Sequence, residues 1–229
     1  MRAVEKAHLR ELATLFLYEK HFSGAQGVEV TPDMRVLVAS QACLLILALG
    51  MEYFDGWREV VIYPGAFRVN RDQVDEQGIV HHEDRALSGE SWSRGPVILS
   101  WDDIEQERLG IHPGRNVILH EFSHKLDMLN GKANGMPPLH SGMDRQQWTR
   151  AFSEAYLQLQ NSLEHHHRPC INPYAATNPA EFFAVVCEYF FSAPEILEQN
   201  CPDVYQQLEL YFRQDPFFRL KGHMSDTKL

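Results

Sequence analysis

The segment from Asn116 to Asp127 contains His120-Glu121-x-x-His124 within a largely apolar run. Residues four apart lie on one face of a helix, so this spacing brings both imidazoles to one spot with Glu121 beside them. Two neutral imidazoles and a nearby carboxylate are typical of a Zn²⁺ site in which the carboxylate is the general base. The alternative is a buried helix whose histidines bond to backbone carbonyls. Because these polar groups are costly to bury without a metal or partners, we expect a metal helix.

A catalytic zinc site of this kind has three protein ligands and one open position. A histidine six residues beyond the motif is excluded, because Asn130 stands there. Glu181 and Glu188 are the charged residues of an apolar helix expected over 179–191, and their seven-residue spacing places them on one face. Either is a candidate third ligand, and Glu188 is alternatively a residue that supports a ligand. Glu181 also fits a capping box in which it reaches back to Asn178.

Asp127 follows His124 by three residues and lies on the same helix face. It either accepts the second ring N–H of a ligand histidine, which fixes the tautomer, or is a solvated acid at the helix end. A closed structural zinc site is a further alternative, but such sites have four ligands, commonly including Cys. No cysteine lies near the motif in the sequence, which disfavours this alternative.

The composition excludes several classes of protein. Hydrophobic residues make up 44% and charged residues 23%, which is ordinary for a soluble globular protein, and the net charge of -10 argues against direct nucleic-acid binding. Cys43 and Cys187 lie in apolar surroundings without a C-x-x-C pattern, which predicts reduced core cysteines. The N-terminus carries charges where a signal peptide is apolar, and the apolar run over 36–50 is too short to span a bilayer. We therefore expect a cytoplasmic protein without membrane contact.

Periodicity and turn residues predict an α+β fold, with helices around a small mixed sheet and a mostly helical C-terminal half. The expected helices are 3–20, 31–50, 102–109, 116–130, 144–163, 179–191 and 194–212. The expected strands are 59–63, 67–69 and 96–101, with loops over 21–27 and 134–144 and a polar loop or hairpin over 71–95. Pro96 places the last strand at a sheet edge, where it either holds an extended peptide or is simply a capped edge.

The domain organisation expected from the sequence is a single domain over residues 1–229. No internal repeat or low-complexity linker divides the chain. We expect an N-terminal lobe at about 1–110, a C-terminal lobe at about 111–220 and an active-site cleft between them.

Two motifs resemble a known family. The sequence His120-Glu-Phe-Ser-His-Lys-Leu-Asp127, together with Asn178-Pro-Ala-Glu-Phe-Phe-Ala184, is similar to the Mlc titration factor A family of bacterial cytoplasmic regulators of glucose uptake. More distantly, these motifs are similar to the catalytic domain of anthrax lethal factor. The resemblance implies a zincin-like metallopeptidase of the gluzincin type that binds one Zn²⁺ per chain. The zinc ligands that the resemblance implies are His120, His124 and Glu181.

The resemblance also implies roles for two further residues. Glu121 is the general base, and Tyr174, seven residues before Glu181, matches the oxyanion donor of the toxin. The expected reaction is peptide hydrolysis, in which zinc lowers the pKa of its water, Glu121 removes the proton, and Tyr174 and zinc stabilise the oxyanion.

Two functions are open at this point. The resemblance implies an aminopeptidase that also binds an Mlc-type transcription repressor and so regulates the glucose phosphotransferase system. The alternative is a non-catalytic repressor-binding protein whose zinc site is vestigial or structural. The negative net charge is compatible with binding a DNA-reading partner but does not distinguish the two.

Overall fold

The structure is a computed structural model that describes residues 1–65, 67–74, 80–87, 89–91, 95–110 and 113–226. Its α-helices are α1 (Ala3–Glu19), α2 (Pro32–Leu45), α3 (Trp101–Arg108), α4 (Val117–Asp127), α5 (Arg145–Glu164), α6 (Pro179–Ser192), α7 (Pro194–Asn200), α8 (Pro202–Phe212) and α9 (Pro216–Asp226). Short 3₁₀ helices are η1 (Met51–Phe54), η2 (Met128–Asn130) and η3 (Pro173–Ala176).

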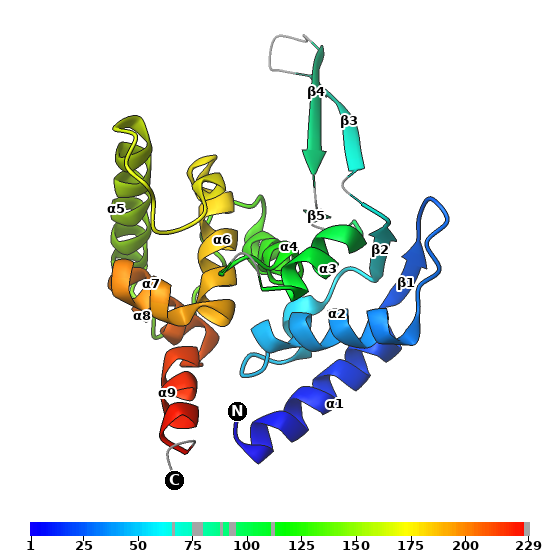
Figure 1. The fold of residues 1–229 in the computed structure, drawn as a ribbon, viewed down its shortest axis with the longest axis horizontal. Helices are drawn as coiled ribbons and strands as arrows, with labels where there is room; N and C mark the ends of the chain where they lie inside the picture. Colours follow the sequence, from blue (N-terminus) through cyan, green and yellow to red (C-terminus); the bar gives the residue numbers. More distant parts are fainter. Residues whose placement is uncertain (66, 75–79, 88, 92–94, 111–112, 227–229) are drawn as a thin grey trace.

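The strands form two separate sheets. They are β1 (His21–Gly24), β2 (Glu59–Tyr63), β3 (Phe67–Val74), β4 (Val80–Leu87), β5 (Gly89–Ser91) and β6 (Val97–Ser100). The larger sheet has the order β1-β2-β6-β5, in which β1, β2 and β6 are parallel and β5 is antiparallel to β6. The polar segment after β2 is a hairpin, because β3 and β4 pair antiparallel, and it projects away from the other elements in Figure 1. The predicted α+β class with a mixed sheet is confirmed.

Two predictions about the sheet were wrong. The loop expected over 21–27 begins with the strand β1, in which His21 pairs with Glu59 of β2. The strand ending before Trp101 is not at an edge, because β5 covers its outer side through the pair Gly89–Leu99. Pro96 precedes this strand rather than interrupting its hydrogen bonds, so it imposes no edge position.

The last predicted helix was also wrong. The segment 194–212 is two helices, α7 and α8, because Cys201 has a non-helical backbone (φ -138°, ψ 59°) and Pro202 starts a new helix. The helix α9 follows and was not predicted. An ion pair of 3.2 Å between Arg219 and Glu5 ties α9 to α1 at the other end of the chain.

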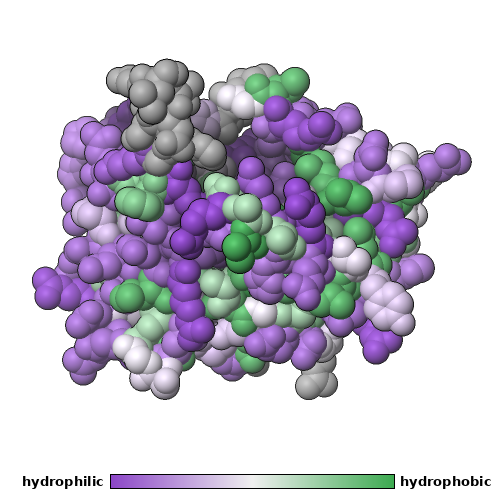
Figure 2. Space-filling view, turned by 90° about the horizontal axis from the view of Figure 1, so that it is seen from below, coloured by the Kyte–Doolittle hydropathy of each residue, from purple (hydrophilic) through white to green (hydrophobic). Residues whose placement is uncertain are grey.

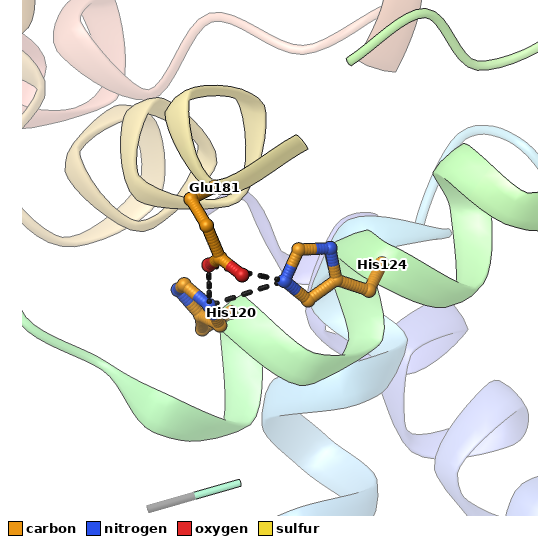
Figure 3. Close-up of side chains that lie close together, drawn as sticks. All are labelled: His120, His124 and Glu181. Atoms are coloured by element: carbon orange, nitrogen blue, oxygen red, sulfur yellow. Dashed lines mark hydrogen bonds and ion pairs between the residues drawn. The ribbon is translucent and has the colours of Figure 1, made fainter. Parts of the chain in front are cut away.

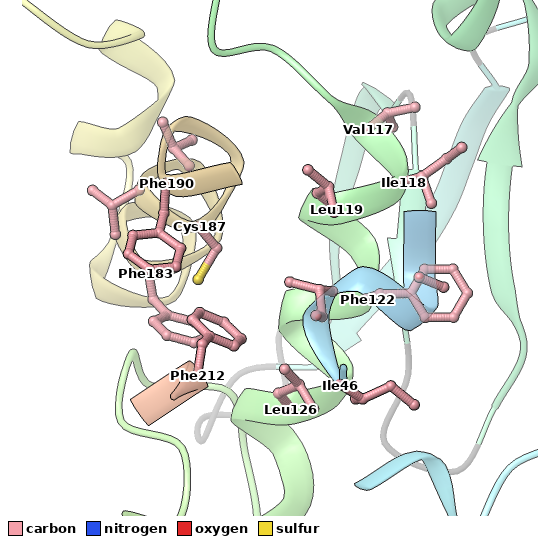
Figure 4. Close-up of a cluster of buried hydrophobic side chains, with 14 of the residues drawn as sticks. Ile46, Val117, Ile118, Leu119, Phe122, Leu126, Phe183, Cys187, Phe190 and Phe212 are labelled. Atoms are coloured by element: carbon pink, nitrogen blue, oxygen red, sulfur yellow. The ribbon is translucent and has the colours of Figure 1, made fainter. Parts of the chain in front are cut away.

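The metal-motif helix α4 lies at the centre of the fold, between the helices of the C-terminal half and the sheet (Figure 1). All of its residues are buried, and it packs against α2, α6, β5 and β6. Figure 4 shows its apolar side chains extending to both sides, with Leu119 toward Cys187 of α6 and Phe122 toward the N-terminal half. Burial on every side explains why this helix is apolar all round apart from the motif, Lys125 and Asp127.

The helices that position the site begin as their sequences predict. Asn116 caps α4, where its Oδ1 accepts the N–H of Leu119 at 2.9 Å. Thr31 caps α2, with Pro32 at the first helical position. No helix in the described ranges is long and apolar enough to cross a membrane. The division into two lobes with a cleft between them stays a prediction.

Candidate metal centre

His120, His124 and Glu181 converge on one point (Figure 3). The Nε2 atoms of the two histidines are 3.2 Å apart. Oε2 of Glu181 lies 3.0 Å from Nε2 of His120 and 3.4 Å from Nε2 of His124. The one-turn spacing on α4 sets the two rings side by side, and α6 brings the carboxylate to them from across the core.

These distances fit a tetrahedrally coordinated metal ion. Tetrahedral ligands at the usual zinc–nitrogen and zinc–oxygen lengths lie about 3.3 Å from one another. The three measured separations of 3.0, 3.2 and 3.4 Å bracket that value. Lone pairs on neutral imidazole nitrogens and on a carboxylate oxygen repel one another when they face the same point. A proton or a cation between them removes this repulsion, so the cluster is suited to a cation.

Glu181 reaches the histidines from the first turn of α6. Asn178 caps that helix, and its Oδ1 accepts the N–H of Glu181 at 3.0 Å. The Glu181 carboxylate lies on the two histidines, so it does not make the return bond of a capping box. Burial alone would raise the pKa of Glu181, but its hydrogen bonds to the two rings outweigh burial and hold this pKa well below its usual range.

Glu188 lies on the other side of the His120 ring, away from the point of convergence. Its Oε1 is 2.7 Å from Nδ1 of His120, and its Oε2 accepts the N–H of Asn116 at 2.6 Å. Burial lowers the pKa of His120, but hydrogen bonds to Glu181 and Glu188 reverse this effect and raise it well above its usual value. Of the two candidate carboxylates, Glu181 is therefore the one that faces both motif histidines.

Glu121 is buried beside the metal point, with 4% of its surface exposed. Its Oε2 has no hydrogen-bond partner among the described residues. Burial raises its pKa to about 7, and the charges of His120 and His124 oppose that rise.

Neither expectation for Asp127 was right. The residue is fully buried, which excludes a solvated acid. Its Oδ2 accepts the N–H groups of Asn134 and Gly135 at 2.8 Å each, so it organises the loop after the helix. Its Oδ1 and Nδ1 of His124 are both buried without a hydrogen-bond partner in the part of the chain that is described, so the ring bond is not formed.

Tyr174 lies on η3, just before α6. Its ring centroid is 6.0 Å from that of His120, and 44% of its surface is exposed. Asn172 fixes the turn by accepting the N–H of Tyr174 at 3.0 Å. The structure thus places the ring of the predicted oxyanion donor near that of His120.

Comparison with known proteins agrees with these motifs. The model of the glucose-regulated metallo-peptidase M90 family matches residues 1–213. The chain belongs to the M90 family. It is 41% identical over 220 residues to Mlc titration factor A of Yersinia pestis (strain Pestoides F), which covers 95% of this chain and 80% of the relative. The same values hold for Mlc titration factor A of Yersinia pseudotuberculosis (strain YPIII).

A solved structure from Bacteroides caccae, named as a candidate zinc-binding metallo-peptidase, is also similar to this M90 protein. It is 14% identical with a TM-score of 0.35, and the match covers 92% of this chain and 85% of the other. The expected resemblance to the Mlc titration factor A family is confirmed by the sequence relatives.

The cysteines of this M90 protein stay apart from the metal ligands. Cys43 and Cys187 are buried free thiols, as the sequence predicted. Among the described residues, the group able to hold a metal contains two histidines and one glutamate and no thiol. Three such groups are fewer than the four ligands that a closed structural zinc site usually has.

Sequence reasoning missed the residues that support the metal helix at its first turn. Val117 donates its N–H to Oε2 of Glu107 at 2.8 Å, and Asn116 donates its side-chain N–H to Gln41 at 2.8 Å. A cap at Asn116 was readable from the sequence, since Asn is favoured at that position. No local pattern indicates Glu107 or Gln41, because both reach α4 from other helices.

Proposed function

We propose that this M90 family member is a zinc-dependent peptidase that hydrolyses peptide bonds. The observation that carries the proposal is the convergence of His120, His124 and Glu181 at separations of a tetrahedral site. A ligand set of two imidazoles and one carboxylate, with one position left for substrate or water, is typical of catalytic zinc. We assign one Zn²⁺ per chain to this point.

Glu121 acts as the general base and then as the general acid. It follows His120 in the same helix, is shielded from solvent, and interacts electrostatically with His120, His124 and Glu181. A cation held by the three ligands lowers the pKa of Glu121 from about 7, because it stabilises the carboxylate. The ionised carboxylate takes a proton from water as the water attacks the carbonyl, and it returns this proton to the leaving amine.

The other participants act on the peptide carbonyl. When bound, zinc supplies Lewis acidity toward the carbonyl oxygen and the attacking water. Tyr174 donates its hydroxyl hydrogen to the oxygen as negative charge develops there. The strand β5 ends the larger sheet and contacts α4, so an extended peptide that pairs with β5 is bound next to the helix that carries the two histidines.

We further propose that the enzyme is an aminopeptidase in the cytoplasm. The support is the resemblance of its two motifs to the Mlc titration factor A family and the 41% identity to relatives of that name. Hydrolysis of aminoacyl p-nitroanilides, compared with the same substrates carrying an acetylated α-amino group, tests this type. Equal rates on both would identify an endopeptidase instead.

Metal content tests the central proposal. Elemental analysis of the purified protein after zinc loading and desalting is expected to give about one zinc per chain. Glu181→Ala is expected to lose it, and Glu195→Gln, an exposed residue of α7, is expected to retain it. If the parent binds no zinc, or if Glu181→Ala retains all of it, the three-ligand assignment is wrong.

A second function is favoured by the names of the relatives. Both Yersinia relatives are Mlc titration factor A, so we propose that this chain also binds an Mlc-type transcription repressor. The face shown in Figure 2 is largely hydrophilic with small hydrophobic groups. The net charge of the chain is -10, to which a basic partner surface is complementary. The repressor is expected to bind Glu121→Gln as tightly as the parent. Loss of binding in that variant would tie repressor capture to catalysis.

A further inference from the structure

Glu188 is a buried carboxylate without an ordinary counter-ion. Only 5% of its surface is exposed, and within the described part of the chain it forms no ion pair with an arginine or lysine. A buried carboxylate is costly unless its oxygens accept good hydrogen bonds. Its two oxygens are accounted for by the ring of His120 and the backbone N–H of Asn116.

The contact with His120 selects the proton position on the ring. A carboxylate oxygen only accepts, so the 2.7 Å contact requires the hydrogen on Nδ1 of His120. In the neutral ring with its hydrogen on Nδ1, the lone pair is on Nε2, which faces the point where His124 and Glu181 converge. This is the tautomer that a metal ligand needs, and a carboxylate on the far nitrogen makes the ring more basic.

The position of Glu188 is itself fixed from the start of α4. Asn116 donates its backbone N–H to Glu188, and its carbonyl accepts the N–H of His120 at 2.9 Å. Asn116, Glu188 and His120 therefore form a closed ring of hydrogen bonds. The Asn116 side chain extends this ring to Gln41 of α2, which accepts its Nδ2–H at 2.8 Å.

We propose that Glu188 is a positioning residue that fixes the orientation and tautomer of His120, with Asn116 and Gln41 as its support. The inference rests on the proposed metal function and adds to it how one ligand is held before the metal arrives. It also joins three helices to one ligand, since α2 supplies Gln41, α4 supplies Asn116 and α6 supplies Glu188. Glu188 does not touch the metal point and is not a third-ligand alternative.

The substitution Glu188→Gln tests the role. An amide oxygen accepts from only one of the two donors, and the amide NH₂ meets the other donor unfavourably. Zinc affinity, measured by competition with a chromogenic chelator, is expected to fall about 10- to 100-fold, as for other residues that hold a metal-bound histidine. The control Glu195→Gln makes the same change of charge at an exposed site of α7 and is expected to bind zinc as the parent does.

A spectroscopic measurement separates positioning from a structural role. In the zinc-loaded parent, ¹⁵N-edited NMR of the histidine rings is expected to place a hydrogen on Nδ1 of His120, with a downfield proton shift from the carboxylate. In Glu188→Gln this signal is expected to move upfield, because a neutral amide is a weaker acceptor. An unchanged signal together with unchanged zinc affinity overturns the proposal.

Two further outcomes have defined meanings. If Glu188→Gln loses zinc as completely as Glu181→Ala does, Glu188 is a ligand and the positioning role is overturned.

If Glu188→Gln does not fold, the variant Gln41→Met tests the proposal instead, because it removes only the outermost acceptor. It is expected to weaken zinc binding about threefold, the effect of one net hydrogen bond, and no weakening overturns the proposal. A parent that binds no zinc refutes the proposed function itself, whereas a variant that binds like the parent refutes only this inference.

Discussion

Gly135 lies so close to Pro179 that a β-carbon on it would be 2.5 Å from the Pro179 carbonyl oxygen. Pro179 is the first residue of α6, two before Glu181. Gly135 belongs to the loop whose backbone N–H groups donate to the carboxylate of Asp127. The loop after the metal helix thus abuts the helix that carries the third candidate ligand. Since Gly135 has φ +79°, a side chain there is disfavoured by conformation as well as by space.

Gly135→Ala is therefore expected to weaken both the fold and the metal site. The left-handed backbone and the contact with Pro179 together are expected to lower the free energy of unfolding by at least about 2 kcal/mol, measured by chemical denaturation. Zinc affinity should fall because α6 must shift. Gly27→Ala is the control, since Gly27 has φ +85° but no atom within 4 Å of its added β-carbon. Equal losses in both variants would show that the contact with Pro179 contributes nothing.

Local patterns were enough to predict the site helices. Asn116, the apolar run of α4 and the histidine spacing all lie within one helix, so caps and periodicity define them together. The pairing of Glu181 with these histidines joins residues about 60 positions apart, and spacing left Glu188 open until the resemblance favoured Glu181. The structure shows the physical reason, since Glu181 faces Nε2 of His120 and Glu188 faces Nδ1.

Non-local pairings explain the errors. The strand β1 contains neither a β-branched residue nor a strict alternation, and it exists because it pairs in parallel with β2 far along the chain. The strand β6 is not at the edge because β5 pairs with it, and β5 has only three residues, too few to be predicted from its sequence. For Asp127, the helix spacing was correct, but its Oδ2 accepts the backbone N–H groups of residues 134 and 135, which periodicity does not place. Its Oδ1 has no hydrogen-bond partner among the described residues.

Glu121→Gln is expected to abolish hydrolysis while leaving the metal in place. An amide keeps the size of the side chain but cannot accept and return the proton, so kcat should fall by at least about 1,000-fold. Zinc content should equal that of the parent, because Glu121 is not among the converging ligands. Steady-state kinetics and elemental analysis of the same preparation check both parts. Hydrolysis at the parent rate would show that Glu121 is not the base.

Tyr174→Phe is expected to lower kcat with little change in KM. The lost hydroxyl would stabilise the oxygen only as charge develops, so a reduction of about 100-fold is expected for one donor. The fold should tolerate the change, since Tyr174 is 44% exposed. Tyr18→Phe on α1, where the ring is 89% exposed, is the control. A rise in KM at constant kcat would instead mean that Tyr174 binds the ground-state substrate.

Glu107→Gln is expected to change how stability depends on pH. Burial raises the pKa of Glu107 from 4.5 to about 7, so the folded state holds its proton more tightly than the unfolded state does. This carboxyl therefore reduces the parent's free energy of unfolding as pH rises from about 4.5 to about 7, by up to about 3 kcal/mol. Glutamine still accepts the N–H of Val117 but does not titrate, so the variant should gain stability relative to the parent across this range. Chemical denaturation at pH 5 and pH 7.5 measures the difference, with the exposed Glu105→Gln as control. If the two proteins differ in free energy of unfolding by the same amount at both pH values, then the pKa of Glu107 is the same in the folded and the unfolded state.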